Sequence, residues 1–202
     1  MTLSFATLLI GLVAIFVWIR VFQDIPNRSA ILVKALPVCF AASLAGYLIE
    51  LLAWSAIWTD IAVRSFIGLV LIAPLVEETA KCLSIRNMAD ARGRLAFVSL
   101  FGILELAISK PLTMTNATHW IEFFQILPAV TMHVLTGVVF AYRLAGRLIG
   151  QLVVCCIIHA TYNGAVLLAS HYDSFDGILF VLLVGMVVAI ILLLPRRRPI
   201  TG

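Results

Sequence analysis

The stretch that decides the fold is IAVRSFIGLVLIAPLVEETAKCLSI, residues 61–85. It is long and apolar enough to form a helix that crosses a membrane, which takes about 20 such residues. It also carries Glu77, Glu78 and Lys81, although a charged side chain at mid-bilayer costs roughly 2.5–3.5 kcal/mol on the insertion scale. The stretch therefore predicts a membrane helix in which charged groups have a function.

The composition of the whole chain agrees with this prediction. Of the 202 residues, 63% are hydrophobic and only 12% are charged, and the mean hydropathy is +1.12. A soluble domain of this size cannot bury so much apolar surface, because its surface is too large relative to its volume. We expect one membrane-embedded domain over residues 1–202, in contact with the lipid bilayer.

Seven apolar segments predict an all-α fold, a polytopic membrane bundle of about seven transmembrane helices. The expected helices cover about residues 3–22, 31–58, 61–85, 95–109, 126–142, 148–170 and 178–194. Polar joins separate them, and the longest join, residues 110–125, is rich in turn-forming residues. Pro74 precedes the two glutamates and is expected to bend that helix, which frees backbone groups nearby.

The basic residues indicate membrane orientation. They lie in short clusters between the apolar segments, as the positive-inside rule describes. With the amino terminus outside and the carboxyl terminus inside, eleven of the 14 lysine and arginine residues face the cytoplasm. The net charge of +4 thus has an explanation other than nucleic acid, and the chain has no polar, aromatic-rich stretch for stacking bases. We expect no nucleic-acid partner.

Acidic and imidazole side chains recur at one depth in four of the expected helices. Glu77, Glu78, Glu105, His133 and His159 each lie eight to twelve residues from the arginine at the cytoplasmic end of their segment. At the rise of an α-helix this is roughly 12–18 Å below the membrane boundary. One shared cavity is the economical prediction, because each group then helps to solvate the others.

Spacing within the segments indicates which side chains share a helix face. Lys81 lies four residues after Glu77 and three after Glu78, so it can pair with either glutamate as a structural counter-ion. Asn163 lies four residues after His159 and faces the same way. The segment with His133 carries a glycine four residues later, which allows a neighbouring helix to approach closely.

Four short motifs, in this order, resemble those of the PrsW-type intramembrane proteases. They are EETAK at residues 77–81, FGILE at 101–105, HVLTG at 133–137 and HATYN at 159–163. The PrsW type belongs to a wider group with the CAAX prenyl proteases and the bacteriocin-processing-like membrane proteins. The chain departs from the CAAX pattern at two places. That pattern has an arginine one position after the position of Lys81, and it has a phenylalanine four residues before the histidine, where this chain has Ala129. This departure argues against prenylated substrates.

The resemblance implies roles for the clustered side chains. Glu77 would be the general base that activates water, and Glu78 would support it or bind a metal. His133 and His159 would hold the water through that metal or donate to the oxyanion. Asn163 would donate to the oxyanion or orient its neighbour. The supporting residues would be Glu105 and Lys81.

Two mechanisms stay open for this set of residues. Glu78, His133 and His159 form an open ligand set for Zn²⁺, which would activate a bound water. A metal-free glutamate mechanism fits equally well. In either case the resemblance implies a catalytic core at about residues 61–170, a membrane-anchored protein substrate such as an anti-sigma factor, and a bacterial or archaeal cytoplasmic membrane.

Two other classes of function also stay open. Intramembrane glutamate, histidine and lysine side chains build proton relays, so a proton-coupled membrane transporter is the first alternative. Such carriers tend to contain inverted repeats, and the sequence shows no internal repeat. The second alternative is a non-catalytic membrane scaffold that retains a degenerate site.

Overall fold

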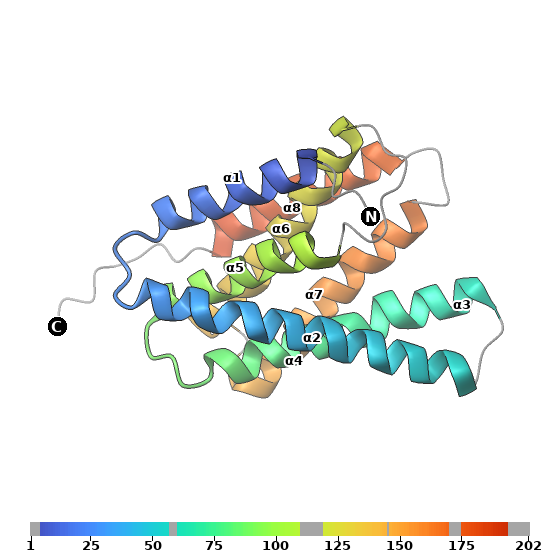
Figure 1. The fold of residues 1–202 in the computed structure, drawn as a ribbon, viewed down its shortest axis with the longest axis horizontal. Coiled ribbons are helices and arrows are strands. Elements are labelled where there is room, and N and C mark those ends of the chain that lie inside the picture. The colour runs from blue at the N-terminus through green and yellow to red at the C-terminus, as the bar shows by residue number, and fades with distance from the viewer. Residues whose placement is uncertain (1–4, 57–59, 110–118, 145, 170–174, 194–202) are drawn as a thin grey trace.

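The computed structural model describes residues 5–56, 60–109, 119–144, 146–169 and 175–193, and the regular structure in these ranges is entirely helical. The prediction of an all-α fold is confirmed for them. In chain order the elements (Figure 1) are α1 (Phe5–Val21), α2 (Arg28–Ala56), α3 (Ile61–Phe66), the π-helix η1 (Ile67–Ile72), α4 (Ala73–Ile85), α5 (Ala91–Ser109), α6 (His119–Tyr142), α7 (Leu148–Ala169) and α8 (Phe175–Leu193).

Most helix bounds lie close to the expected ones. The deciding stretch, residues 61–85, is one continuous run of α3, η1 and α4. Helix α5 begins at Ala91, before the expected residue 95. The reason is that the Asp90 carboxylate accepts hydrogen bonds from the backbone N–H groups of Arg92 (3.2 Å) and Gly93 (2.7 Å) and so caps the helix.

The start of α6 differs most from expectation. The helix begins at His119, so the predicted polar join over residues 110–125 is wrong for residues 119–125. Apolar residues at positions 120, 123, 124 and 127 recur at helical spacing, and this pattern outweighs the turn-forming residues that precede it. Residues 110–118 of the join lie outside the described ranges.

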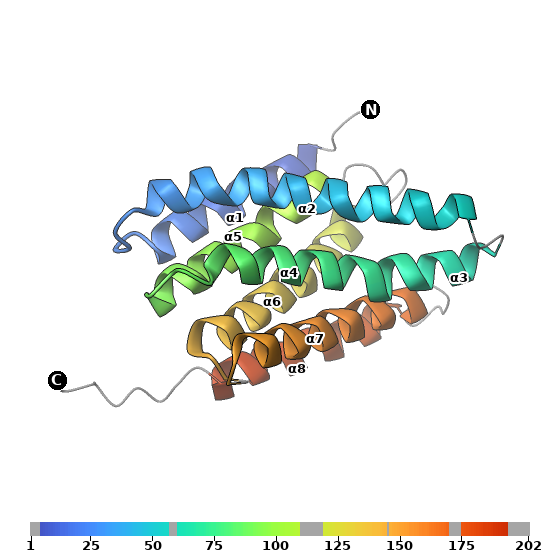
Figure 2. The ribbon, with the colours of Figure 1, turned by 90° about the horizontal axis from the view of Figure 1, so that it is seen from below.

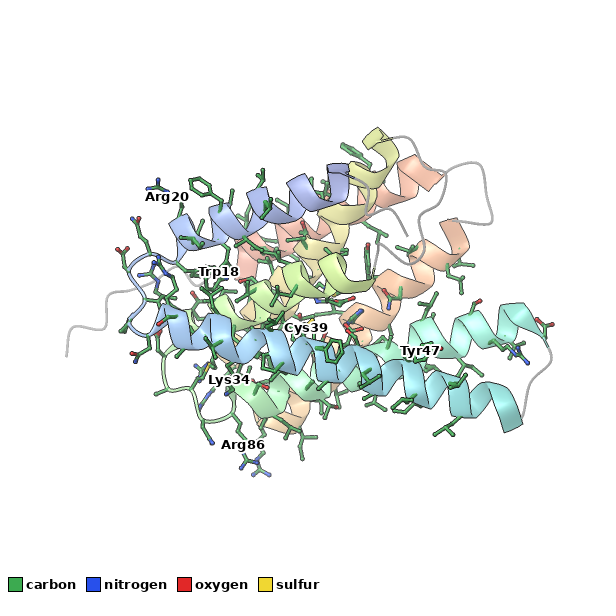
Figure 3. The ribbon with its side chains drawn as sticks, viewed as in Figure 1. Trp18, Arg20, Lys34, Cys39, Tyr47 and Arg86 are labelled. Carbon is green, nitrogen blue, oxygen red and sulfur yellow. The ribbon has the colours of Figure 1, made fainter. Side chains whose placement is uncertain are left out.

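Three helix connections lie at one end of the bundle. Figure 1 and Figure 2 both place the α1–α2 and α4–α5 connections there, and Figure 2 shows the end of α6 and the start of α7 at the same end. The side chains of Arg20, Lys34 and Arg86 lie toward the same end (Figure 3). These three basic side chains, from α1, α2 and the end of α4, therefore lie at one end of the bundle.

Helix α5 forms the centre of the bundle and contacts α1, α2, α4 and α6. Its Phe97, Leu100 and Phe101 side chains are fully buried. On α1 the indole N–H of Trp18 donates to the backbone oxygen of Ala96 over 2.8 Å. A buried indole N–H needs such a partner, so this bond fastens α1 to the central helix.

The outer faces of the helices carry exposed apolar side chains. Val33 on α2, Ile149 on α7 and Leu192 on α8 are 75%, 76% and 74% exposed. Within the described residues, Arg28–Ile49 and Leu148–Leu168 are long and apolar enough to cross a membrane, and shorter apolar stretches cover Leu12–Val21, Leu127–Tyr142 and Phe180–Leu193. By length and composition, the chain thus has two candidate membrane spans in its described part.

Candidate active site

Side chains from four helices meet inside the bundle. Helix α4 supplies two adjacent glutamates and a lysine one turn later, α5 supplies a third glutamate, and α6 and α7 supply one histidine each. We call this set the charged cluster; its members are Glu77, Glu78, Lys81, Glu105, His133 and His159. The convergence that was predicted from their common depth is present in the structure.

Lys81 links α4 to α6. Its ammonium nitrogen lies 2.6 Å from Glu78 Oε1 and 2.8 Å from His133 Nδ1, and 4.9 Å from the centre of the Phe101 ring. The side chains of Glu78 and Lys81 are both 0% exposed. An ion buried this deeply carries a large desolvation penalty unless it is paired, so each of the two stabilises the other.

The contacts of His133 indicate its tautomer. A lysine ammonium can only donate, so Nδ1 of His133 accepts from Lys81 and the ring proton lies on Nε2. This Nε2 lies 2.6 Å from Glu105 Oε2 and forms an ion pair with it when the ring is protonated. Both ring nitrogens of His133 therefore have partners.

Two glycines allow α5 and α6 to approach closely around His133. A Cβ atom at Gly102 would overlap the Cβ and Cγ atoms of His133. A Cβ atom at Gly137 would lie 3.1 Å from Leu95 Cδ1, so the predicted close approach at this glycine is confirmed. Gly102 had no predicted role, although a glycine one turn before the intramembrane Glu105 is a usable signal for helix contact.

His159 lies between the two glutamates of α4. Its Nδ1 is 2.9 Å from Glu78 Oε1, and its Nε2 is 3.8 Å from Glu77 Oε2. When the ring is neutral and its Nδ1–H donates to the Glu78 carboxylate, Nε2 carries the lone pair. Its lone pair faces Glu77 across a gap that is wider than a hydrogen bond.

The three carboxylates of the charged cluster differ in exposure. The Glu78 side chain is 0% exposed, whereas those of Glu77 and Glu105 are 13% and 16% exposed. Glu77 Oε2 is a buried atom that accepts no hydrogen bond from the described residues, and the same holds for Glu78 Oε2. Most buried polar atoms do have a partner, so the more exposed of the two glutamates, Glu77, marks a place where a water, a substrate group or a cation can bind.

The residues that could hold a metal ion are Glu77, His133 and His159, whose ligand atoms lie within 4.8 Å of one another. Two imidazoles and one carboxylate match an open zinc site. The carboxylate differs from the expected Glu78, because Glu78 is held by Lys81 and by His159. Both nitrogens of His133 already have partners, so a metal ion would have to displace one of them.

The balance of charge in the cluster also bears on metal binding. With neutral histidines, three carboxylates face one ammonium group. Two further positive charges would balance the cluster, either as protons or as one divalent cation. The donor set and the charge thus fit zinc, and they fit a protonated, metal-free cluster as well.

Asn163 is directed at the backbone of η1. Its Nδ2 donates to the backbone oxygen of Leu69 over 2.7 Å. Asn163 shares the His159 face of α7, as its spacing predicts, but the partner of its amide N–H is the π-helix that precedes the two glutamates. A role as an oxyanion donor stays a prediction.

The contacts of the charged cluster are the basis for assigning chemistry to the chain. Comparisons with protein-family models, with curated proteins and with solved structures find no match. The resemblance to the PrsW type therefore rests on its four motifs alone. The cluster itself combines a carboxylate oxygen without a donor, an imidazole lone pair and an imidazole N–H, which are the groups that acid–base hydrolysis uses.

Proposed function

We propose that the chain is an intramembrane protease that hydrolyses a peptide bond of a membrane-anchored protein. One observation carries the proposal: Glu77 Oε2, which accepts no hydrogen bond from the described residues, lies 3.8 Å from Nε2 of His159, which can accept a hydrogen bond when the ring is neutral. Two acceptors at this separation can hold one water by its two hydrogens. The PrsW-like motifs supply the class of substrate.

The proposal includes about seven membrane spans with the amino terminus outside. The exposed apolar side chains on the outer faces, the candidate spans in α2 and α7, and the basic connections at one end support this arrangement. Contact with lipid makes such a surface favourable. The resemblance adds a bacterial or archaeal cytoplasmic membrane.

Glu77 is the general base of the proposed reaction. It takes a proton from the bound water while the water oxygen attacks the carbonyl carbon of the substrate. The tetrahedral intermediate collapses when Glu77 passes this proton to the amide nitrogen and the C–N bond breaks. The products are a carboxylic acid and a free amine, and one water molecule is consumed.

The other members of the charged cluster keep these groups in place. Glu78 accepts from His159 Nδ1–H and so keeps the lone pair on Nε2, facing Glu77. Lys81 keeps the ring proton of His133 on Nε2. Once this N–H turns from Glu105 to the substrate, His133 can donate to the oxyanion that forms on the substrate carbonyl.

A zinc ion is compatible with the same residues. Glu77, His133 and His159 would hold it, with His133 released from Glu105. The ion would polarise the substrate carbonyl and activate water. About one zinc per purified chain, with activity lost on chelation and restored by zinc, would support this version; full activity in the metal-free protein would support the glutamate version.

Cleavage of a membrane-anchored reporter by the purified protein in liposomes tests the proposal. We expect Glu77→Gln and His159→Ala to abolish cleavage. Asp90→Asn is the matched control, because it makes the same carboxylate-to-amide change at the cap of α5, outside the charged cluster. Cleavage that survives both Glu77→Gln and His159→Ala would end the protease proposal.

The same liposomes separate the alternative functions. Ion-dependent proton flux that is lost in Glu77→Gln would identify a proton-coupled carrier. A protein that neither cleaves membrane-anchored reporters nor carries protons would fit the non-catalytic scaffold.

A further inference from the structure

The junction of η1 and α4 leaves one backbone oxygen without an N–H partner in its own helix. In η1 the backbone N–H of Ala73 donates to the oxygen of Gly68, five residues earlier. The next residue, Pro74, has no N–H. The oxygen of Leu69 therefore receives neither the N–H of residue 73, as in an α-helix, nor that of residue 74, as in a π-helix.

Asn163 on α7 supplies the missing donor, at 2.7 Å from Leu69 O. In the interior of a bilayer no water is present to replace it, and an unsatisfied carbonyl is costly there. About two turns earlier on the same face of α7, the Cys156 thiol lies 3.7 Å from the oxygen of Pro74. His159 lies between these two positions on α7, so the face that presents its imidazole also holds the π–α junction.

We propose that Asn163 is a positioning residue: it retains the π-turn before Pro74 and thereby sets the direction in which Glu77 and Glu78 leave α4. A π-turn contains more residues than an α-turn. Reverting η1 to an α-helix would rotate the following residues by about 100° for each residue of register. Glu77 would then turn away from His159, although no group that touches the substrate had changed.

A variant that gives the Leu69 oxygen a backbone N–H donor in place of the Asn163 amide tests this role. Pro74→Ala adds a backbone N–H at the position from which a π-helix reaches the Leu69 oxygen, and Asn163→Leu removes the amide donor at similar size. We expect Asn163→Leu alone to lower kcat/KM for reporter cleavage about tenfold, mainly through kcat. In the Pro74→Ala background the same change should lower it by no more than about twofold, because the two sites are coupled.

Two further variants sharpen the comparison. Asn163→Gln keeps an amide N–H and should retain more activity than Asn163→Leu. Gln151→Leu is the matched control, because Gln151 also lies on α7 and donates its side-chain amide to a backbone oxygen, that of Gly146, over 2.6 Å. Pro74→Ala should not relieve any loss caused by Gln151→Leu. An equal loss from Asn163→Leu in both backgrounds would show that Asn163 acts on the reaction directly, and the proposal would be wrong.

Thermal unfolding in detergent tests the contact without reference to activity. Asn163→Leu should lower the unfolding midpoint by about 2–4 °C, and the Pro74→Ala background should remove most of that shift. Equal shifts in the two backgrounds overturn the inference. Its kinetic consequence rests on the proposed function, whereas the contact does not: rescue of the midpoint in a protein that cleaves no reporter would defeat the protease and leave the contact intact.

Discussion

Glu77 and Glu78 are neighbours in the chain, yet their surroundings differ. Glu78 is 0% exposed and bonds to Lys81 and His159, whereas Glu77 is 13% exposed and its Oε2 accepts no hydrogen bond from the described residues. We call Glu78 with Lys81 the closed side of the charged cluster, and Glu77 with Glu105 the open side. Both contacts of Glu78 are made by Oε1, and its Oε2 also accepts no hydrogen bond from the described residues. The two sides therefore differ in exposure and in the ion pair with Lys81, which holds Glu78 in place, whereas Glu77 is the glutamate that the proposed reaction uses.

The largest expected effect separates the two glutamates by activity. Glu77→Gln removes the base and should lower reporter cleavage by about 100- to 10,000-fold, the usual contribution of a positioned general base. Its midpoint of thermal unfolding should stay at the wild-type value. Glu78→Gln should lower both cleavage and the midpoint, because an amide cannot neutralise Lys81. Equal midpoints for the two variants would remove the distinction between the closed and open sides.

On the closed side, Lys81→Met leaves Glu78 buried without its counter-ion. The free energy of unfolding should fall by about 3–5 kcal/mol, measured by denaturant titration in mixed micelles. The double variant Lys81→Met/Glu78→Leu replaces both partners by apolar groups and should recover most of that loss, but not the cleavage activity. A double variant as unstable as the single one would contradict this account of the pair.

Gly102→Ala alters the packing around His133, which contacts Lys81 of the closed side and Glu105 of the open side. The added Cβ atom would overlap the imidazole ring, and overpacking of this kind costs about 1–3 kcal/mol. Cleavage should fall with stability, because His133 must move away from Lys81. Gly137→Ala is the control: its Cβ would meet the flexible end of Leu95 at 3.1 Å and would lie in ordinary contact with Val98 at 3.4 Å. An equal loss at both glycines would mean that His133 is not specially constrained.

The smallest effect is expected on the open side, in Glu105→Gln. The amide oxygen can still accept from His133 Nε2–H, but without the negative charge. Charge-assisted and neutral hydrogen bonds differ by about 1 kcal/mol, so cleavage should fall only about fivefold. A loss as large as that of Glu77→Gln would instead assign the base to Glu105.

Features that depend on position along the chain could be predicted from the sequence. The continuous helical run over residues 61–85 follows from its apolar length, and the convergence of Glu77, His133 and His159 follows from equal depth in separate helices. The prediction was wrong for the start of α6. Turn-forming residues before His119 favour a longer join, whereas the apolar residues at helical spacing after it favour the helix that the structure has.

The partners within the charged cluster could not be predicted in the same way. Spacing lets Lys81 meet either glutamate, and the contact with Glu78 depends on side-chain packing against α6. Spacing places Asn163 on the His159 face but cannot show that its partner is a backbone oxygen. Pro74 is the available signal for that contact, because a missing N–H implies an oxygen nearby that needs another donor.

The ion pair within α4 bears on how the protein is made. A helix that leaves the translocation channel meets lipid before its later neighbours have been synthesised, so charges that are paired only between helices would be bare at that moment. Glu78 and Lys81 lie on the same helix and bond directly over 2.6 Å, so in the proposed membrane arrangement α4 would bring its own counter-ion into the bilayer. The histidines follow on α6 and α7, so the charged cluster is complete only after α7 has been synthesised.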